Sequence, residues 1–413
     1  MTEGQVRAEI LVVGAGPGGA ATASRLAQAG HDVLLVDRAE FPRDKTCGDG
    51  LTPRCVDALA QMGALGAVMA AGAKKVTGVR MVGPRGETVS LDFADFLPGR
   101  PPYGLVLERH TLDDVLRQHA VRAGACYLSN VKIETFTLAG DRITAAHGTS
   151  NGAPLTFHPD AVVLATGASN RLVKHLGLMK KMPATVRAVR GYYQGLVDPD
   201  PVFDFYFHDY LMPGYGWIFP LAGGRANVGV GVWSGWWAQL LNPKPPLPRL
   251  LDRFVQEQSA DGGSPGWQPL GPTKGYPIRT DFPSHRIAGE NWLLVGESAG
   301  LVNPATGEGI DLAVESGLLA ADTLSRSLKQ SKWRGGAYQR RVWLRFAPQF
   351  SGTRVFATIV INPILMDYTI WQMSHHRFLT RATMRLALGY APPWLTLHPL
   401  FLLQFFLPLP TPF

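Results

Sequence analysis

The strongest constraint on the fold lies in the first forty residues, where a glycine-rich turn joins a strand pattern to a helix pattern. Residues 9–13 ("EILVV") are apolar and strand-like, "GAGPGG" follows at 14–19, and "AATASRLAQAG" has the composition of a helix. A second strand pattern, "DVLLVD", ends at Asp37. These segments form one βαβ unit of about thirty residues, which predicts a Rossmann-like domain built on a parallel sheet.

The glycines of this turn predict a dinucleotide site. Gly14, Gly16 and Gly19 let the backbone approach a pyrophosphate, whose charge the N-terminus of the following helix stabilises. Asp37 ends the next strand, where a carboxylate accepts hydrogen bonds from ribose hydroxyls. An ordinary glycine-rich turn is disfavoured because strand, helix and acid are all in place. The turn by itself does not separate NAD from FAD.

A second glycine-rich segment, near residue 300, favours the longer cofactor. After the strand pattern at 291–295, "GESAG" at 296–300 and "NPATGEGI" at 303–310 open another helix. Two remote nucleotide-contacting loops favour FAD over NAD. "GESAG" also matches the Gly-x-Ser-x-Gly elbow of α/β-hydrolases, and Asp367 and His375 follow in the required order. We disfavour a hydrolase because it leaves the N-terminal dinucleotide unit unexplained.

The apolar period changes to two between residues 185 and 233. "VFDFYFHDY" places Phe203, Phe205 and Phe207 on one face, and "GYGWIFPL" and "ANVGVGVW" give further strands between glycine-rich turns. The pattern predicts an antiparallel sheet with one aromatic face, which by itself is typical of an ordinary core.

The chain has only three cysteines, Cys47, Cys55 and Cys126. Their odd number and wide spacing predict neither a disulfide framework nor a metal site. With a polar N-terminus, they lead us to expect a cytoplasmic protein. Cys47 stands in a glycine-rich loop, "FPRDKTCGDG", and the sequence leaves open whether its thiol reacts or only packs.

Together these segments resemble the FAD-dependent oxidoreductases of the para-hydroxybenzoate hydroxylase type. Glu108-Arg109 before the helical "TLDDVLRQHA", and "VVLATGAS" at 162–169, add to the likeness. Within that group, "FPRDKTCGDGLTPR" and "PGYGWIFPLAGGRANVGVGV" are similar to the PxxKxCGDG and YxWxFP motifs of the geranylgeranyl reductase family, including its menaquinone reductase members. The resemblance spans nearly the whole chain.

The resemblance implies an α/β fold with three parts: a Rossmann-like FAD-binding domain, an antiparallel-sheet substrate domain and a helical C-terminal extension. The expected bounds are 1–75, 105–184 and 285–330 for the first, 76–104 and 185–284 for the second, and 331–413 for the third. The implied activity saturates carbon–carbon double bonds of a polyprenyl chain, geranylgeranyl or a quinone side chain, by hydride transfer from reduced FAD.

The resemblance also assigns residues. It implies catalytic roles for Cys47, Tyr215 and Trp217, and substrate contacts from Tyr215, Trp217 and Phe219. Aromatic faces stabilise carbocation character by about 1–2 kcal/mol each when water is excluded. Gly48 and Gly50 would keep the flavin face open. The implied FAD contacts are Gly14, Gly16, Gly19, Asp37, Arg38, Lys45, Cys47, Gly48, Asp49, Arg109, Thr166, Gly167, Gly296, Glu297, Pro304, Gly307, Gly309 and Ile310.

Departures from the related flavoproteins leave two questions open. Thr166 and Glu297 stand where related flavoproteins often carry aspartate, so the electron donor, NADPH or ferredoxin, is not assigned. The alternative function is a flavin-dependent monooxygenase or halogenase of the same fold. The run Tyr215-Gly-Trp217-Ile-Phe219-Pro220 differs from the Trp-x-Trp-x-Ile-Pro of halogenases. Electron transfer to quinones without substrate turnover usually needs an iron–sulfur cluster, which three scattered cysteines cannot ligate alone.

Positive charge concentrates at the C-terminal end. Residues 321–413 hold eleven Lys and Arg against two acids, a net +9, whereas the whole chain carries +8. The apolar stretches at 355–373 and 392–413 are interrupted by polar residues and prolines and do not predict membrane spans. Basic flanks beside broken apolar segments fit peripheral contact with the inner face of a membrane. The alternative is a helical cap on the core, and nucleic-acid binding is disfavoured.

Overall fold

The predicted βαβ unit forms and organises the first sheet. In the computed structural model, which describes residues 4–179, 183, 186–196, 201–233, 245–260, 266–360 and 362–391, β1 (Gln5–Val13) leads through Gly14 into α1 (Pro17–Gln28). The chain returns in β2 (Val33–Val36), which pairs parallel with β1. The apolar residues of both strands are buried on both faces, as parallel sheets require.

The strand order of this sheet brings the two glycine-rich loops together. The order is β8–β2–β1–β11–β10–β9, and β18 pairs with the far side of β11. Because β1 and β18 both run parallel to β11, the loops that follow them meet at one edge of the sheet. The remaining strands are β8 (Cys126–Leu128), β9 (Val131–Ala139), β10 (Arg142–Ser150), β11 (Ala153–Leu164) and β18 (Trp292–Leu294).

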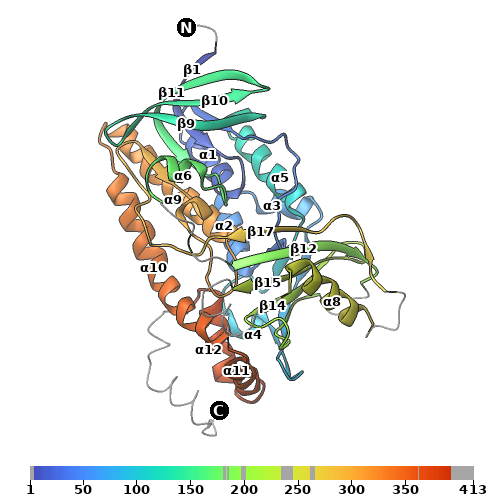
Figure 1. Ribbon diagram of the computed structural model, residues 1–413. Helices are drawn as coiled ribbons and strands as arrows, with labels where there is room; N and C mark the ends of the chain where they lie inside the picture. The colour runs from blue at the N-terminus through green and yellow to red at the C-terminus, as the bar shows by residue number, and fades with distance from the viewer. Residues whose placement is uncertain are drawn as a thin grey trace.

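The second sheet is the aromatic one. Its order is β16–β12–β15–β14–β13–β5–β6, with β17 beside β12, and α8 (Leu247–Ala260) covers its outer side (Figure 1). The side chains of Phe203, Phe205 and Phe207 all face one cavity, which confirms the predicted period of two. The strands are β5 (Gly78–Val82), β6 (Thr88–Asp92), β12 (Val186–Gln194), β13 (Val202–Tyr206), β14 (Gly214–Leu221), β15 (Arg225–Trp233), β16 (Gln268–Pro269) and β17 (Lys274–Ile278).

Further elements lie between and beside the two sheets, including a third sheet of order β3–β7–β4. The sequence predicts one helix from Pro53 to about Leu65, but α2 ends at Met62 because Gly63 adopts a left-handed backbone with φ +82°. These elements are β3 (Gly50–Leu51), α2 (Pro53–Met62), α3 (Leu65–Ala70), β4 (Lys74–Val76), α4 (Phe93–Phe96), β7 (Gly104–Val106), α5 (Arg109–Arg122), α6 (Arg171–His175), the 3₁₀ turn η1 (Gly296–Ala299) and α9 (Ile310–Lys329).

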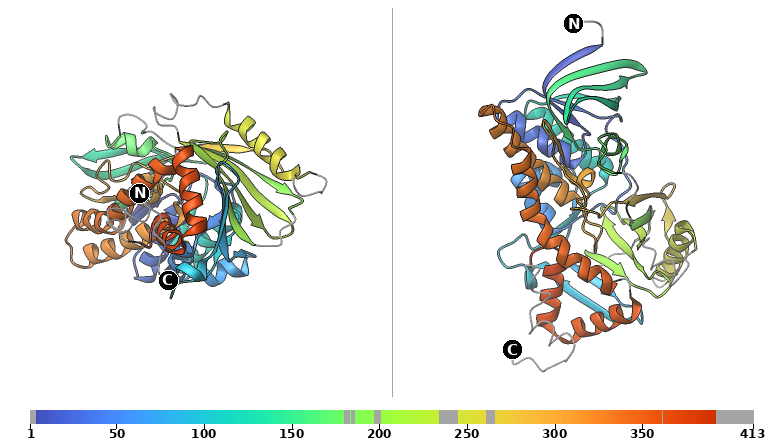
Figure 2. Two further views of the ribbon diagram at one scale, coloured as in Figure 1. Left: turned by 90° about the horizontal axis from the view of Figure 1, so that it is seen from below. Right: turned by 60° about the vertical axis from the view of Figure 1, so that its left-hand side comes forward.

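The C-terminal region is helical, as predicted. Figure 2 shows α10 (Gly335–Val360) running along one side of the molecule from the first sheet towards the second. There α11 (Pro363–His375) packs on β6 and α12 (Arg377–Ala387) packs on α4. Asn362 caps α11 by accepting from the backbone N–H groups of Ile364 and Leu365. No helix among the described residues is long and apolar enough to cross a membrane, and the apolar tail at 392–413 lies outside those residues.

Candidate active site

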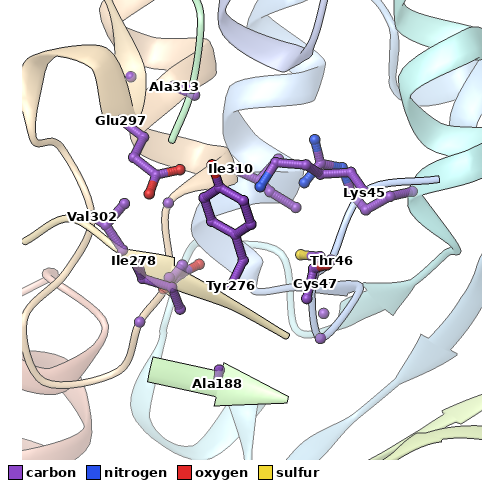
Figure 3. A pocket seen from close by; sticks show the side chains of 18 of the residues that line it. Lys45, Thr46, Cys47, Ala188, Tyr276, Ile278, Glu297, Val302, Ile310 and Ala313 are labelled. Carbon is purple, nitrogen blue, oxygen red and sulfur yellow. The ribbon is translucent and has the colours of Figure 1, made fainter. Parts of the chain in front are cut away.

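One cavity of about 680 Å³ extends from the glycine-rich turn after β1 to the aromatic face of the second sheet. Every residue that the sequence assigns to FAD, substrate or catalysis lines this cavity, except Gly19 and Pro304. Figure 3 shows part of its wall, with Lys45, Cys47, Tyr276 and Glu297 around the space. Apart from those two, the predicted site residues, which lie mostly in loops beside the first sheet and on β14 of the second, therefore line one cavity.

The end of the cavity beside α1 has the form of a dinucleotide site. Gly14 has φ +105°, and a Cβ there would collide with the carbonyl of Ala165. Gly19 does not face the cavity; it packs against the carbonyl of Gly14 and so permits the tight turn. Asp37 is buried and accepts from the backbone N–H of Ala15 at 2.8 Å. The first turn of α1 holds no acid, so its N-terminus presents a positive potential to the cavity.

Opposite charges flank the middle of the cavity. Figure 3 shows the Tyr276 side chain between Lys45 on one side and Glu297 on the other. Burial lowers the pKa of Lys45 and raises the pKa of Glu297, and each is partly offset by the charge of the other. Glu297 also accepts from the backbone N–H of Arg279 at 3.1 Å. This part of the wall can both donate and accept hydrogen bonds, and Tyr276 belongs to it although sequence reasoning missed it.

A buried hydrogen-bond network fixes the loop around Cys47. Asp49 has a left-handed backbone with φ +65°, and its carboxylate accepts from Tyr192 Oη at 2.7 Å and from Asn227 Nδ2 at 2.8 Å. Asn227 Nδ2 also donates to the Cys47 carbonyl at 2.8 Å, and Asn227 Oδ1 accepts from Trp217 Nε1 at 3.0 Å. Burial raises the pKa of Asp49 to about 6, against the lowering effect of its two donors. Asn227 thus joins the loop to the aromatic wall.

Gly48 and Gly50 are required by packing as well as by access to the flavin. A Cβ at Gly48 would lie 3.1 Å from Phe219 Cε2 and 3.3 Å from Trp217 Nε1. A Cβ at Gly50 would lie 3.0 Å from both Phe203 and Phe219. The loop therefore needs glycine in order to lie directly against the aromatic side chains.

Arg109 lines the cavity but is already held by protein. Its Nε and Nη2 bind the Asp113 carboxylate at 2.6 and 2.7 Å, and its backbone N–H reaches Asp49 Oδ1 at 3.3 Å. Arg43 pairs with the same Asp113 at 2.8 Å. The aspartate holds two cations at the edge of the cavity, an arrangement that the sequence did not reveal.

The aromatic wall is formed by three side chains of β14. The ring centroids of Tyr215 and Trp217 lie 6.0 Å apart, and those of Trp217 and Phe219 lie 6.3 Å apart. Phe205 of the neighbouring strand meets Tyr215 at 5.5 Å and Phe219 at 5.4 Å. Trp217 can lie flat on β15 because Gly229 has no side chain there. The result is a rigid apolar surface facing the cavity.

Hydrogen bonds attach this wall to the loop before α9. Tyr215 Oη donates to the Thr306 carbonyl at 2.5 Å, and Trp233 Nε1 donates to the Pro304 carbonyl at 2.9 Å. Pro304 therefore does not line the cavity. Its carbonyl instead holds Trp233 in place by accepting this hydrogen bond.

The opposite wall of the aromatic chamber comes from the C-terminal helices. It is lined by Met366, Thr369 and Met373 of α11, by Met384 of α12, and by Leu388, which follows the last residue of α12. Sequence reasoning missed these residues, although the spacing of 366, 369 and 373 places them on one helix face. Methionine adapts to irregular apolar surfaces, so this wall suits a flexible apolar ligand.

Comparison with known proteins adds to this geometry. The FAD binding domain family matches residues 7–200. A menaquinone reductase of Mycobacterium tuberculosis is 35% identical over 382 residues, covering 86% of this chain and 89% of the relative. A digeranylgeranylglycerophospholipid reductase of Methanosphaera stadtmanae is 29% identical over 339 residues, covering 79% of this chain and 80% of that protein.

Solved structures share the architecture. A geranylgeranyl bacteriochlorophyll reductase-like protein of Thermoplasma acidophilum superimposes with a TM-score of 0.79 at 24% identity, covering 96% of this chain and 98% of its own. A flavin-dependent brominase superimposes with a TM-score of 0.75 at 17% identity, covering 94% and 96%. At these identities both likenesses concern the fold alone.

Proposed function

Because this chain belongs to the geranylgeranyl reductase family of FAD-dependent oxidoreductases, we propose that it saturates carbon–carbon double bonds of a polyprenyl chain. The observation that carries the proposal is the single cavity, which joins a dinucleotide turn to an apolar chamber walled by aromatic rings and methionines. A polyprenyl chain has the shape and polarity of that chamber.

The end of the cavity beside α1 fits FAD. Gly14 and Gly16 would admit the pyrophosphate to the N-terminus of α1, and Asp37 keeps lone pairs free to accept from ribose hydroxyls. Lys45 and the loop before α9, which also opens a helix N-terminus, would hold the ring system. When bound and reduced, FAD supplies the hydride of the reaction.

The aromatic wall positions the substrate and excludes water. Tyr215, Trp217 and Phe219 would pack along an isoprenoid chain and hold one double bond near the loop that carries Cys47. If positive charge develops on a tertiary carbon, each aromatic face stabilises it by about 1–2 kcal/mol in a dry site. The Cys47 thiol either takes part in this environment or packs against the ring system.

The natural substrate that we propose is the prenyl side chain of a quinone. Support comes from the menaquinone reductase at 35% identity, whose likeness covers most of both chains. Mass spectrometry of lipid quinones from cells that lack this protein tests it. The quinone should become lighter by two hydrogens for each bond that is left unsaturated. If the quinones are unchanged and the polyprenyl phospholipids are altered, the substrate would instead be a phospholipid, as the name of the digeranylgeranylglycerophospholipid reductase indicates for that relative.

The C-terminal helices carry a surface suited to an anionic membrane, and we include peripheral membrane contact in the proposal. Ile364 is 73% exposed and Phe378 is 48% exposed. Arg377, Arg381 and Arg385 follow at intervals of four along the outside of α12. The inner faces of the same helices line the chamber, so a lipid could pass between membrane and cavity over a short path.

The electron donor would be NADPH or ferredoxin, and the residues at Thr166 and Glu297 do not favour either. Stopped-flow reduction of the bound flavin by each donor distinguishes them. The alternative of a monooxygenase or halogenase predicts that product formation consumes oxygen, whereas the reductase works without it.

A further inference from the structure

Reduction of an alkene consumes one proton for each hydride, and the apolar chamber needs a source for it. This inference rests on the function proposed above and identifies that source. Three carboxyl groups lie where the loop lining the cavity enters α9: Glu308, Asp311 and Glu315. Asp311 and Glu315 lie four residues apart on one face of α9, and Glu308 stands two residues before the helix begins.

Glu308 is the member of this group that reaches the reaction chamber. Glu308 is partly buried, and it lines the cavity. The Thr52 hydroxyl, next to the Cys47 loop, donates to its Oε1. Tyr215 Oη lies close to the same loop: a Cβ at Gly307 would stand 3.5 Å from it. Glu308 and Tyr215 line the same cavity, and the charge of Glu308 acts on the Tyr215 hydroxyl, so the carboxyl lies near the aromatic wall.

The surroundings of Glu308 contain too few cations to keep all three carboxyls ionised. The buried Arg54 pairs through Nε with Glu315 at 2.8 Å and with Asp311 at 3.2 Å. Arg345 pairs with Glu315 at 3.0 Å from the solvent side, where its side chain is half exposed. No cation among the described residues forms an ion pair with Glu308, whose partner is the neutral Thr52 hydroxyl. Electrostatic balance therefore favours the protonated form of Glu308.

The three carboxyls interact through their charges and extend from the cavity towards solvent. Glu308 lines the cavity, Asp311 is buried, and Glu315 meets the half-exposed Arg345. Asp311 Oδ1 and Arg54 Nη2 are buried and have no hydrogen-bond partner among the described residues. Such atoms are rare in proteins and mark places where a proton or a bridging water is accommodated.

Two other buried acids near the cavity are less suited to this role. Both oxygens of Asp49 accept from donors, namely Tyr192, Asn227 and the Arg109 backbone, so its bonds favour the ionised form. Glu297 faces the charge of Lys45 and accepts from a backbone N–H.

We propose that Glu308 donates the proton to the alkene and that Asp311 and Glu315 return one to it from solvent. The Glu308 O–H bond breaks, and the electron pair of the alkene π bond forms the new C–H bond with that proton. The neighbouring carbon receives the hydride from reduced FAD, which is thereby oxidised. Glu308 remains as a carboxylate until a proton passes inward along Glu315 and Asp311.

The direction in which the pKa of Glu308 is shifted agrees with its role as proton donor. Burial, then the charge of Asp311, raises the pKa of Glu308 well above its ordinary value, while Thr52 and Arg54 lower it. The other groups that face it are Glu315, Tyr215, Cys55 and Tyr390. A raised pKa favours the protonated acid over a wider range of pH, and activity should fall as pH rises through that pKa.

Infrared spectroscopy of the full-length protein tests the protonation state without any turnover. At pH 8 the wild type should show a protonated carboxyl stretch that shifts in D₂O and disappears in Glu308→Gln. The amide of that variant can still accept from Thr52, so its fold should persist. Absence of the band from the wild type, or its survival in Glu308→Gln, would overturn the proposal even if reduction of polyprenyl chains is confirmed.

Turnover kinetics of the FAD-loaded protein provide a second test, of the role of Glu308 as proton donor. Glu308→Gln should bind FAD normally and reduce a polyprenyl quinone about 10²–10⁴-fold more slowly, with no fall at high pH. Glu308→Asp should recover part of the rate, and Glu257→Gln on the surface helix α8 should match the wild type. A full rate in Glu308→Gln would refute the assignment. If wild-type protein reduces no polyprenyl substrate, the proposed function fails while the infrared result still decides the protonation of Glu308.

Discussion

Asn227→Ala should weaken both the fold and the site, because Asn227 holds the Cys47 loop against Trp217. The substitution removes one bond to Trp217 Nε1 and two from Nδ2, to the Cys47 carbonyl and to Asp49 Oδ2. Asp49 Oδ2 keeps its bond from Tyr192, so two groups lose their partner. Each buried group left unsatisfied costs about 1–3 kcal/mol, and the Cys47 carbonyl is only partly buried. We therefore expect the free energy of unfolding to fall by about 2–4 kcal/mol.

The assay is urea unfolding of the FAD-loaded protein, followed by tryptophan fluorescence and compared with turnover. The urea midpoint should fall with an unchanged slope, and turnover should fall further than stability because Trp217 is no longer fixed. Gln118→Ala, at an exposed position on α5, serves as the control and should leave both unchanged. If Asn227→Ala equals the wild type in midpoint and turnover, the network does not hold the site.

Three further predictions concern the same chain. Tyr192→Phe removes a donor to the ionised form of Asp49, so the pKa of Asp49 should rise from about 6 by about one unit, measured by pH titration of flavin absorbance. Because that pKa already exceeds its unfolded value, stability of the wild type should decline from about pH 4 to pH 6 and then level off, and in Tyr192→Phe the decline should extend to higher pH. Trp217→Ala and Cys47→Ala should both keep the yellow flavin and lose most turnover; full activity in both would remove the assigned roles. Ile364→Asp should reduce sedimentation with anionic liposomes at low salt, and unchanged partitioning would count against the membrane surface.

The nucleotide half of the site could be predicted from the sequence because its signals are local. Gly14, Gly16 and Asp37 stand at fixed offsets within one βαβ unit, and the geometry of the turn requires those residue types. The second loop follows the same strand–turn–helix logic, so parallel pairing of β1, β11 and β18 brings it to the first. The domain bounds stay a prediction.

The supporting residues could not be predicted because their partners are distant in sequence. Asn227 stands in a glycine-rich strand with no local signal, and its partners Cys47 and Asp49 come from the first fifty residues. Met366 and Met373 show a helical period, but the period does not reveal what their face contacts. Glu308 stands within a recognised motif, yet its partial burial, and the engagement of Arg54 with Asp311 and Glu315, depend on the packing of α2 against α9.

The most direct test of the central claim is an anaerobic single turnover. Purified protein loaded with FAD is reduced with dithionite, freed of excess reductant, and mixed with menaquinone that carries an unsaturated polyprenyl side chain. The yellow colour of oxidised flavin should return, and the quinone side chain should gain two hydrogens for each flavin oxidised. A bound flavin that stays reduced in the presence of the lipid, with the side chain unchanged in mass, would contradict it.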